Sequence, residues 1–303
     1  MMKIYFICLL LISGFFSVNA QSSKRSKTDS ASSYFKADAS FLSNYIYNGR
    51  QDSLRTPYLT PTIGYYDKSG LWVSGSLSYL ANPNDSRIDL YSLDIGYDFD
   101  LTDHFSGSVY ANKSFYNDAS TVINSALKGS IGSTISYDLD FLQVNAGIDI
   151  LFSNKADIAT NIGLSHAFYI GDKGSLYTIT PTVTTNLSTL HYYEGYANRK
   201  AGKKANQVIP NLQSITVETT VNNNQFTLMD YEISLPFTYD SKKIGFFITP
   251  TFAIPKNPIY TTTTTTIKLR TGTQTSQTAD STPWEEKNLA NSFYAEIGCY
   301  LKF

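Results

Sequence analysis

Apolar and polar residues alternate along most of this chain, and residues 291–303 show the pattern most clearly. One set of alternate positions there is apolar: Phe293, Ala295, Ile297, Cys299, Leu301 and Phe303. The positions between them are mostly polar or amphipathic: Ser292, Tyr294, Glu296, Gly298, Tyr300 and Lys302. Because side chains of a β-strand point alternately to its two faces, the pattern predicts a strand with one apolar and one polar face.

The same alternation recurs along the chain and predicts twelve strands. They cover about residues 35–45, 58–66, 71–79, 88–99, 105–115, 122–137, 141–151, 158–170, 177–187, 228–239, 244–254 and 291–303. Most reach the roughly 9–11 residues that a tilted strand needs to cross a bilayer. An even number of strands allows an antiparallel sheet to close on itself. We therefore expect an all-β fold, an antiparallel up-and-down transmembrane β-barrel of 12 strands.

The connections between these strands alternate in length, which supports the same fold. Links after odd-numbered strands are mostly longer: 47–57, 81–87, 116–121, 152–157, about 188–227 and about 255–290. Links after even-numbered strands are short: 67–70, 101–104, 138–140, 171–174 and 240–243. Transmembrane barrels have short periplasmic turns and longer extracellular loops. The alternation places both chain termini in the periplasm.

The two longest loops and four prolines complicate the pattern. Alternation at Ile215, Val217 and Val221, and the threonine run 261–266, favour extended structure. We expect two hairpins that continue the barrel wall, with disordered loops as the alternative. Proline removes a hydrogen bond from a sheet, so bulges or strand ends are expected at Pro61, Pro181, Pro236 and Pro250.

Residues 1–20 have the features of a secretory signal peptide. A short basic start precedes an apolar run that ends in Val18-Asn19-Ala20, which predicts cleavage after Ala20. The alternative, a membrane anchor, is disfavoured because a spanning helix needs about 20 apolar residues. Residues 21–33 are rich in Ser and Lys and predict a disordered periplasmic tail. The barrel then comprises residues 34–303.

Composition agrees with a membrane barrel. The mean hydropathy is −0.19, with 23 Tyr, 18 Phe and only 16% charged residues, as expected when half of the strand residues face water and aromatic girdles mark the interfaces. A net charge of −1 gives no reason to expect a nucleic-acid partner. After cleavage Cys299 would be the remaining cysteine, so no intramolecular disulfide is expected.

Two stretches carry a resemblance to known families. Residues 291–303 resemble the C-terminal strand of Gram-negative outer-membrane barrels, which implies that Tyr300, Leu301 and Phe303 form a signal for the barrel-assembly machinery. Residues 37–101 contain ADASFLSNYIYNGR, TIGYYDKSGLWVSGSLSYL and RIDLYSLDIGYDFDL. They resemble a family of small, uncharacterised outer-membrane barrel proteins. The resemblance implies the cell outer membrane as location, with lipid and lipopolysaccharide as neighbours, and implies no substrate.

The polar strand faces predict the residues that line the lumen. By alternation these are Lys36, Asp38, Asp94, Asp98, Lys128, Asp149, Asp230, Glu232 and Glu296, with Lys302 at the periplasmic rim. Carboxylates outnumber lysines, so the lumen is expected to be acidic and to concentrate cations. The alternative is that these charges pair across a plugged barrel and hold it rigid.

These features favour a passive pore or uptake channel for small polar solutes. The alternative is a non-conducting barrel whose surface loops bind a partner or a surface polymer. A more remote alternative is an outer-membrane lipase using His104 and Ser106, but the flanking motif is absent and the pair lies at the periplasmic end. We expect no enzyme activity, no metal site and no cofactor.

One basic cluster lies in the longest loop. It comprises Arg199, Lys200, Lys203 and Lys204. It could contact lipopolysaccharide phosphates, or it could be a solvated loop tip.

Overall fold

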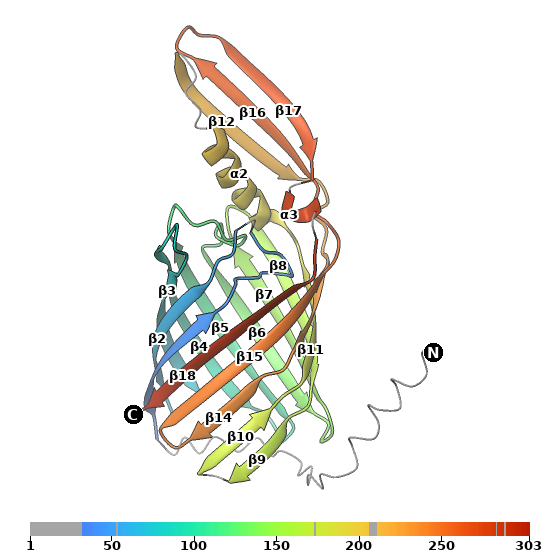
Figure 1. The fold of residues 1–303 in the computed structure, drawn as a ribbon. Coiled ribbons are helices and arrows are strands. Elements are labelled where there is room, and N and C mark those ends of the chain that lie inside the picture. The colour runs from blue at the N-terminus through green and yellow to red at the C-terminus, as the bar shows by residue number, and fades with distance from the viewer. Residues whose placement is uncertain (1–31, 53, 173, 206–210, 283, 288) are drawn as a thin grey trace, which may run out of the picture.

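The chain folds into a closed antiparallel β-barrel of 12 wall strands, as the alternation predicted (Figure 1). The structure, a computed structural model, describes residues 32–303 except 53, 173, 206–210, 283 and 288. Residues 1–20 and most of the expected tail lie outside the described residues. The wall closes where the first strand pairs with the last, with Ala37 opposite Leu301. Closure removes the free edges of the sheet.

Nine wall strands are single elements and three consist of two elements each. The single ones are β1 (Tyr34–Leu42), β2 (Tyr58–Tyr66), β3 (Leu71–Leu80), β4 (Arg87–Asp100), β5 (Phe105–Tyr116), β6 (Gly129–Asp138), β7 (Gln143–Phe152), β15 (Ile244–Pro255) and β18 (Ser292–Lys302). The divided ones are β8 (Ala156–Ser165) with β9 (Phe168–Asp172), β10 (Ser175–Ile179) with β11 (Thr182–Ser188), and β13 (Thr227–Ser234) with β14 (Phe237–Ser241).

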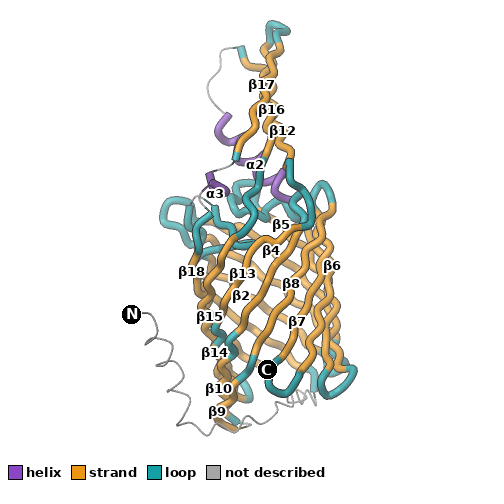
Figure 2. The backbone as a smooth tube through the Cα atoms, turned by 90° about the vertical axis from the view of Figure 1, so that its right-hand side faces the viewer, coloured by secondary structure: helices purple, strands orange, loops and turns teal. Residues whose placement is uncertain are grey.

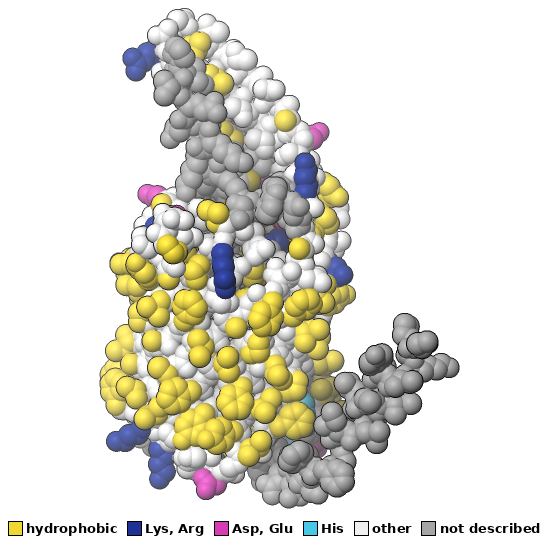
Figure 3. Space-filling model, viewed as in Figure 1, with side chains coloured by type: hydrophobic (Ala, Val, Ile, Leu, Met, Phe, Trp, Pro, Cys, Tyr) yellow, Lys and Arg dark blue, Asp and Glu magenta, His cyan; other side chains and the backbone are white. Residues whose placement is uncertain are grey.

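Apolar side chains cover the outside of the wall, as Figure 3 shows for one side of the barrel. On β4, for example, Leu93 and Ile95 are 57% and 51% exposed, while Asp94 between them is only partly exposed. An outward apolar belt around a polar interior is typical of a transmembrane β-barrel. Within the described residues, no helix is long and apolar enough to cross a membrane.

The two ends of the barrel differ in their connections (Figure 2). At one end, here the turn end, short turns such as residues 67–70 and 242–243 join the strands. The other end, here the loop end, carries residues 43–57, 117–128 and the two longest connections. Most links at the loop end are longer than the turns, as predicted, but the β7–β8 link, residues 153–155, is as short as a turn.

The two longest loops do not continue the barrel wall, contrary to our expectation. The first contains α2 (His191–Ala205) and β12 (Leu212–Val221), and the second contains β16 (Thr261–Leu269), β17 (Gln274–Ser281) and the short α3 (Trp284–Lys287). Strand β12 pairs with β16, and β16 pairs with β17. Together they form a separate three-stranded sheet that projects beyond the loop end (Figure 1).

The predicted strand 122–137 was too long at its start. Strand β6 begins at Gly129, and Val122 and Ile123 are buried inside the loop end. Val122 and Ile123 are apolar because they pack into a core, not because they face lipid. Their apolar character therefore extended the predicted strand beyond its actual start.

The prolines interrupt the wall as expected at two positions. Pro181 lies between β10 and β11, and Pro236 lies between β13 and β14. Pro61 and Pro250 stay inside β2 and β15. At Pro61 the pairing of β2 with β3 is interrupted between Leu59 and Thr62.

Candidate functional site

The interior of the barrel is lined by polar side chains that bond across non-adjacent strands. Tyr110 of β5 donates a hydrogen bond of 2.8 Å to Asp149 of β7. The bond passes over Gly132 of β6, where a Cβ atom would stand only 2.2 Å from Asp149 Oδ1. A glycine is therefore needed beneath this bridge. Contacts that skip a strand are possible only on the concave face, so Asp149 lies in the lumen.

Two further predicted carboxylates take part in similar polar networks. Asp94 accepts hydrogen bonds from Asn112 at 2.7 Å and Ser92 at 2.9 Å. Glu232 of β13 accepts a 3.0 Å bond from the hydroxyl of Tyr294 on β18, two strands away. The lumen wall is thus polar and internally hydrogen-bonded.

Lys36 and Lys302, both at the turn end of the barrel, lie close to the same tyrosine. Lys36 Nζ is 3.6 Å from Asp38 and 4.7 Å from the ring centre of Tyr300. Lys302 Nζ lies 5.1 Å from the same ring centre. These contacts gather Lys36, Asp38 and Lys302 at one end of the lumen.

The remaining predicted lumen residues differ in their surroundings. Asp98 is exposed near the turn end and accepts a 3.1 Å bond from Trp72. Glu296 lies on β18 and is partly exposed. Asp230 is fully buried and accepts a 2.7 Å bond from Asn186.

Lys128 does not line the lumen as expected. It precedes β6, is exposed at the loop end, and donates a 3.2 Å hydrogen bond to Asn154 in the β7–β8 connection. The shorter β6 explains the difference, because Lys128 falls outside the regular alternation.

A packed core lies at the loop end of the barrel; we call it the plug. It is formed by residues 43–56, residues 117–128, the segment from Leu190 to Tyr196, and α3 with the nearby Ile259. Its buried apolar members include Ile123, Leu127, Leu190, Tyr192, Tyr193, Tyr196, Met229 and Ile259. A second buried cluster joins Val122 to Tyr58 and Leu80 on the wall. At the loop end of β2, β3, β7 and β15, inward-facing residues are buried against the plug.

Hydrogen bonds join the separate segments of the plug. Asn124 donates to the Tyr45 hydroxyl at 2.7 Å. Asn48 donates to the Tyr192 hydroxyl at 3.2 Å. The Tyr196 hydroxyl donates to Asp52 at 3.0 Å. Three connections that lie far apart in the sequence therefore form one unit.

Arg50 is the most completely bonded residue of the plug. Its five N–H groups donate to Glu286 and to the backbone carbonyls of Asn48, Met229, Lys256 and Asn257, at 2.7–3.2 Å. The side chains of Arg50 and Glu286 are both fully buried. Burial raises the pKa of Glu286, and the nearby Arg50 opposes that rise. Removing one partner of such a pair leaves a buried charge, at a cost of about 3–5 kcal/mol.

Helix α2 is attached to the wall through its N-terminus. Asp157 of β8 accepts 2.7 Å hydrogen bonds from the backbone N–H groups of His191 and Tyr192. A carboxylate at this position satisfies N–H groups that have no partner inside the helix. Burial raises the pKa values of Tyr192, Tyr193 and Tyr196, so these tyrosines stay neutral.

The sequence analysis missed Arg50, Glu286 and Asp157. The one local signal is Asn48-Gly49, two turn-forming residues directly before Arg50. Both have positive φ angles, 51° and 71°. A Cβ atom on Gly49 would be 2.7 Å from the Cβ of Asp230, so the tight turn brings residues 43–56 against the wall.

The other predicted residues lie away from the lumen or at its rim. Arg199, Lys200, Lys203 and Lys204 belong to α2 and not to a loop tip. Phe303 stacks on Phe35 with ring centres 6.0 Å apart, beside the seam formed by β1 and β18. His104 is exposed in the turn before β5, with its ring near Tyr137.

Comparisons with known proteins find related folds only among solved structures. No family model and no curated protein matches the chain. A structure described as KdgM porin aligns with a TM-score of 0.42 and 8% identity, covering 88% of this chain and 99% of that one. LpxR from Salmonella typhimurium aligns with a TM-score of 0.42 and 10% identity, covering 88% and 100%. OmpF from Salmonella typhi has a TM-score of 0.30 and 11% identity, covering 90% and 97%.

Proposed function

We propose that this protein is an outer-membrane channel for small polar solutes that is closed at its loop end by the plug. The observation that carries the proposal is the polar interior below the plug. Inward-facing carboxylates such as Asp94, Asp149 and Glu232 occur at several heights, whereas Lys36 and Lys302 lie at the turn end. Rings of acidic side chains favour cations over anions.

The proposed location follows from the apolar belt and the closed wall. A closed barrel satisfies its backbone hydrogen bonds internally, as the hydrocarbon core requires. Short turns are usual on the periplasmic side of bacterial barrels. With this orientation the turn end faces the periplasm, and the plug faces the exterior.

The plug must move for solutes to pass, and Arg50 is the residue whose loss should release it. Replacing Arg50 by Ala removes hydrogen bonds to four plug and wall segments and leaves Glu286 buried without its cation. The expected destabilisation of the plug is about 3–5 kcal/mol. The wall strands keep their own hydrogen bonds, so the barrel itself should remain folded.

Liposome swelling tests the proposal. Proteoliposomes with the wild-type protein should swell slowly in an isotonic solution of a neutral pentose, and those with Arg50→Ala should swell at least several times faster. Arg55→Ala is the matched control, because Arg55 lies in the same connection but is exposed, and its guanidinium donates to the Ser43 carbonyl at 2.8 Å. A folded Arg50→Ala barrel that admits no more solute than the wild type would contradict the proposal.

A second candidate function rests on the projecting sheet. All eight residues of β17 are exposed, and hydroxyl pairs such as Thr264 with Thr278 at 3.0 Å and Thr266 with Ser276 at 2.9 Å line its surface. A flat array of hydroxyl groups can hydrogen-bond a surface polymer such as a polysaccharide.

Deleting the β16–β17 hairpin separates the two candidates. If the sheet binds a polymer, cells that express the shortened protein should lose adhesion to a polysaccharide-coated surface. Liposome swelling by the Arg50→Ala variant should be unchanged by the same deletion. Unchanged adhesion would remove the second candidate.

A further inference from the structure

Three prolines lie at the same level on three adjacent wall strands. Pro181 precedes β11, Pro236 follows β13, and Pro250 lies within β15. In the wall, β11 pairs with β13 and β13 pairs with β15. The prolines therefore form a continuous line across the sheet, which we call the proline seam.

Hydrogen bonding across the proline seam is incomplete. His166 N–H donates to the Pro181 carbonyl at 3.2 Å, Thr180 to Pro236 at 2.9 Å, and Leu235 to Pro250 at 3.1 Å. Proline has no N–H group and cannot return a bond. Each strand pair thus loses a bond of its ladder at this level. Below the proline seam, β9, β10 and β14 continue as a separate part of the sheet beside β15.

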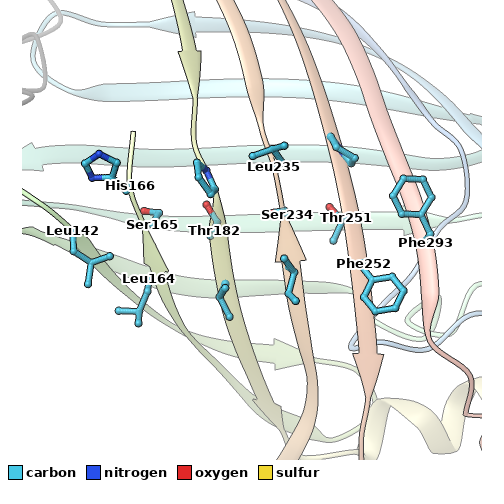
Figure 4. Close-up of a pocket in the computed structure, with 14 residues that line it drawn as sticks. Leu142, Leu164, Ser165, His166, Thr182, Ser234, Leu235, Thr251, Phe252 and Phe293 are labelled. Atoms are coloured by element: carbon cyan, nitrogen blue, oxygen red, sulfur yellow. The ribbon is translucent and has the colours of Figure 1, made fainter. Parts of the chain in front are cut away.

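A groove of about 520 Å³ follows the proline seam (Figure 4). Its lining includes the outward side chains of Leu164, Val183, Ile233 and Phe252, which are 38–49% exposed. Beside these residues, Ser165, Thr182 and Ser234 pair in register, Ser165 with Thr182 and Thr182 with Ser234. By alternation their side chains point toward the lumen, where Asn145 donates a 3.1 Å hydrogen bond to the Ser165 hydroxyl. The outward lining of the groove is therefore mostly apolar.

We propose that this groove binds one acyl chain of a membrane phospholipid. It continues the apolar belt that faces the bilayer, where water is a poor occupant because an apolar surface offers it few hydrogen bonds. None of its lining residues is Asp, Glu, Lys or Arg, and His166 is the one imidazole among them. Its volume lies within the range of about 300–1,000 Å³ common for small-molecule sites. The occupancy of this outer-surface groove does not depend on whether the lumen conducts.

Native mass spectrometry of the full-length mature protein tests this proposal. The protein is extracted from membranes in mild detergent and released from the micelle at increasing collision energy. The wild type should retain one phospholipid after lipids bound elsewhere have dissociated. Val183→Trp fills the groove and should reduce that retained fraction at least fivefold.

Ile95→Trp is the matched control. Ile95 is 51% exposed on β4, close to the 48% of Val183, and does not line the groove. This variant should retain the lipid like the wild type. Heat-modifiable migration on gels establishes that both variants are folded.

Four outcomes would overturn the proposal. They are a wild-type protein that retains no lipid, equal retention by Val183→Trp and the wild type, equal loss in both Trp variants, and a retained mass that matches a free fatty acid. Phosphatidylethanolamine and phosphatidylglycerol should be retained equally in exchange experiments. A strong preference for one headgroup would also contradict an acyl-chain site.

Discussion

On β13, neighbouring side chains face opposite sides of the barrel wall. Glu232 faces the interior and accepts a hydrogen bond from Tyr294, whereas Ile233 is 49% exposed on the outside. Asp230, two residues before Glu232, has the same facing but is fully buried near the plug. A charged side chain on the lipid face costs up to about 2–4 kcal/mol at the bilayer midplane for Lys or Arg and less for Asp or Glu, which favours this register.

Cysteine labelling tests the register at single-residue resolution. In a Cys299→Ala background, Glu232→Cys should react with a small water-soluble maleimide in nanodiscs, because the lumen is wet. Ile233→Cys should react slowly, since it faces lipid. Asp230→Cys should react more slowly than Glu232→Cys because the plug covers it. Mass spectrometry of the labelled protein measures all three rates.

The opposite order would show that the strand is turned inside out. If Ile233→Cys labels faster than Glu232→Cys, the acidic residues do not line the lumen, and the argument for cation preference fails with them.

At the scale of elements, α2 depends on a wall strand for its start. Asp157→Ala removes two hydrogen bonds to the first N–H groups of the helix. Loss of such a cap costs about 0.5–2 kcal/mol. Hydrogen exchange at the amides of residues 191–196 should therefore accelerate by roughly two- to thirtyfold at 25 °C. Asp118→Asn, an exposed change at the same end of the barrel, should leave the exchange unchanged, and equal effects would contradict the cap.

The orientation of the strands gives an independent prediction. An epitope inserted after Thr273, in the β16–β17 turn, should be detected by antibody on intact cells. One inserted at Lys173, between β9 and β10, should be detected only after the outer membrane is permeabilised. The reverse pattern of antibody detection would show that the barrel has the opposite orientation in the membrane, and it would not contradict the barrel fold.

Sequence alternation predicted the wall strands and the extended structure at β12 and β16, but not α2, α3 or the plug. A wall strand alternates because one face meets lipid and the other meets water, so Leu93, Asp94 and Ile95 reveal their facing locally. Val122 and Ile123 pack into the plug, and their apolar run extended the predicted sixth strand wrongly. Helix α2 was missed because its cap comes from Asp157, more than 30 residues earlier in the sequence.

At the scale of the whole molecule, contacts between distant segments build the plug at one end of the barrel. Arg50 donates hydrogen bonds to residues up to 236 positions away in the sequence. No local sequence pattern predicts such distant partners. The candidate site was therefore predictable in part: Asp94, Asp149 and Glu232 follow from alternation, whereas the plug follows only from the fold. The sequence singled out four prolines as possible interruptions, but the alignment of Pro181, Pro236 and Pro250 into the proline seam follows only from the strand register.

Single-channel recording in planar bilayers tests the central claim, a polar acidic lumen closed by the plug, most directly. The wild-type protein should stay closed for most of the record, and Arg50→Ala should give frequent openings whose reversal potential in a salt gradient indicates cation preference. Adding Glu232→Gln and Glu296→Gln to Arg50→Ala should lower that preference while the openings persist. Folded Arg50→Ala protein that remains silent at every voltage, or openings that prefer anions, would contradict the account.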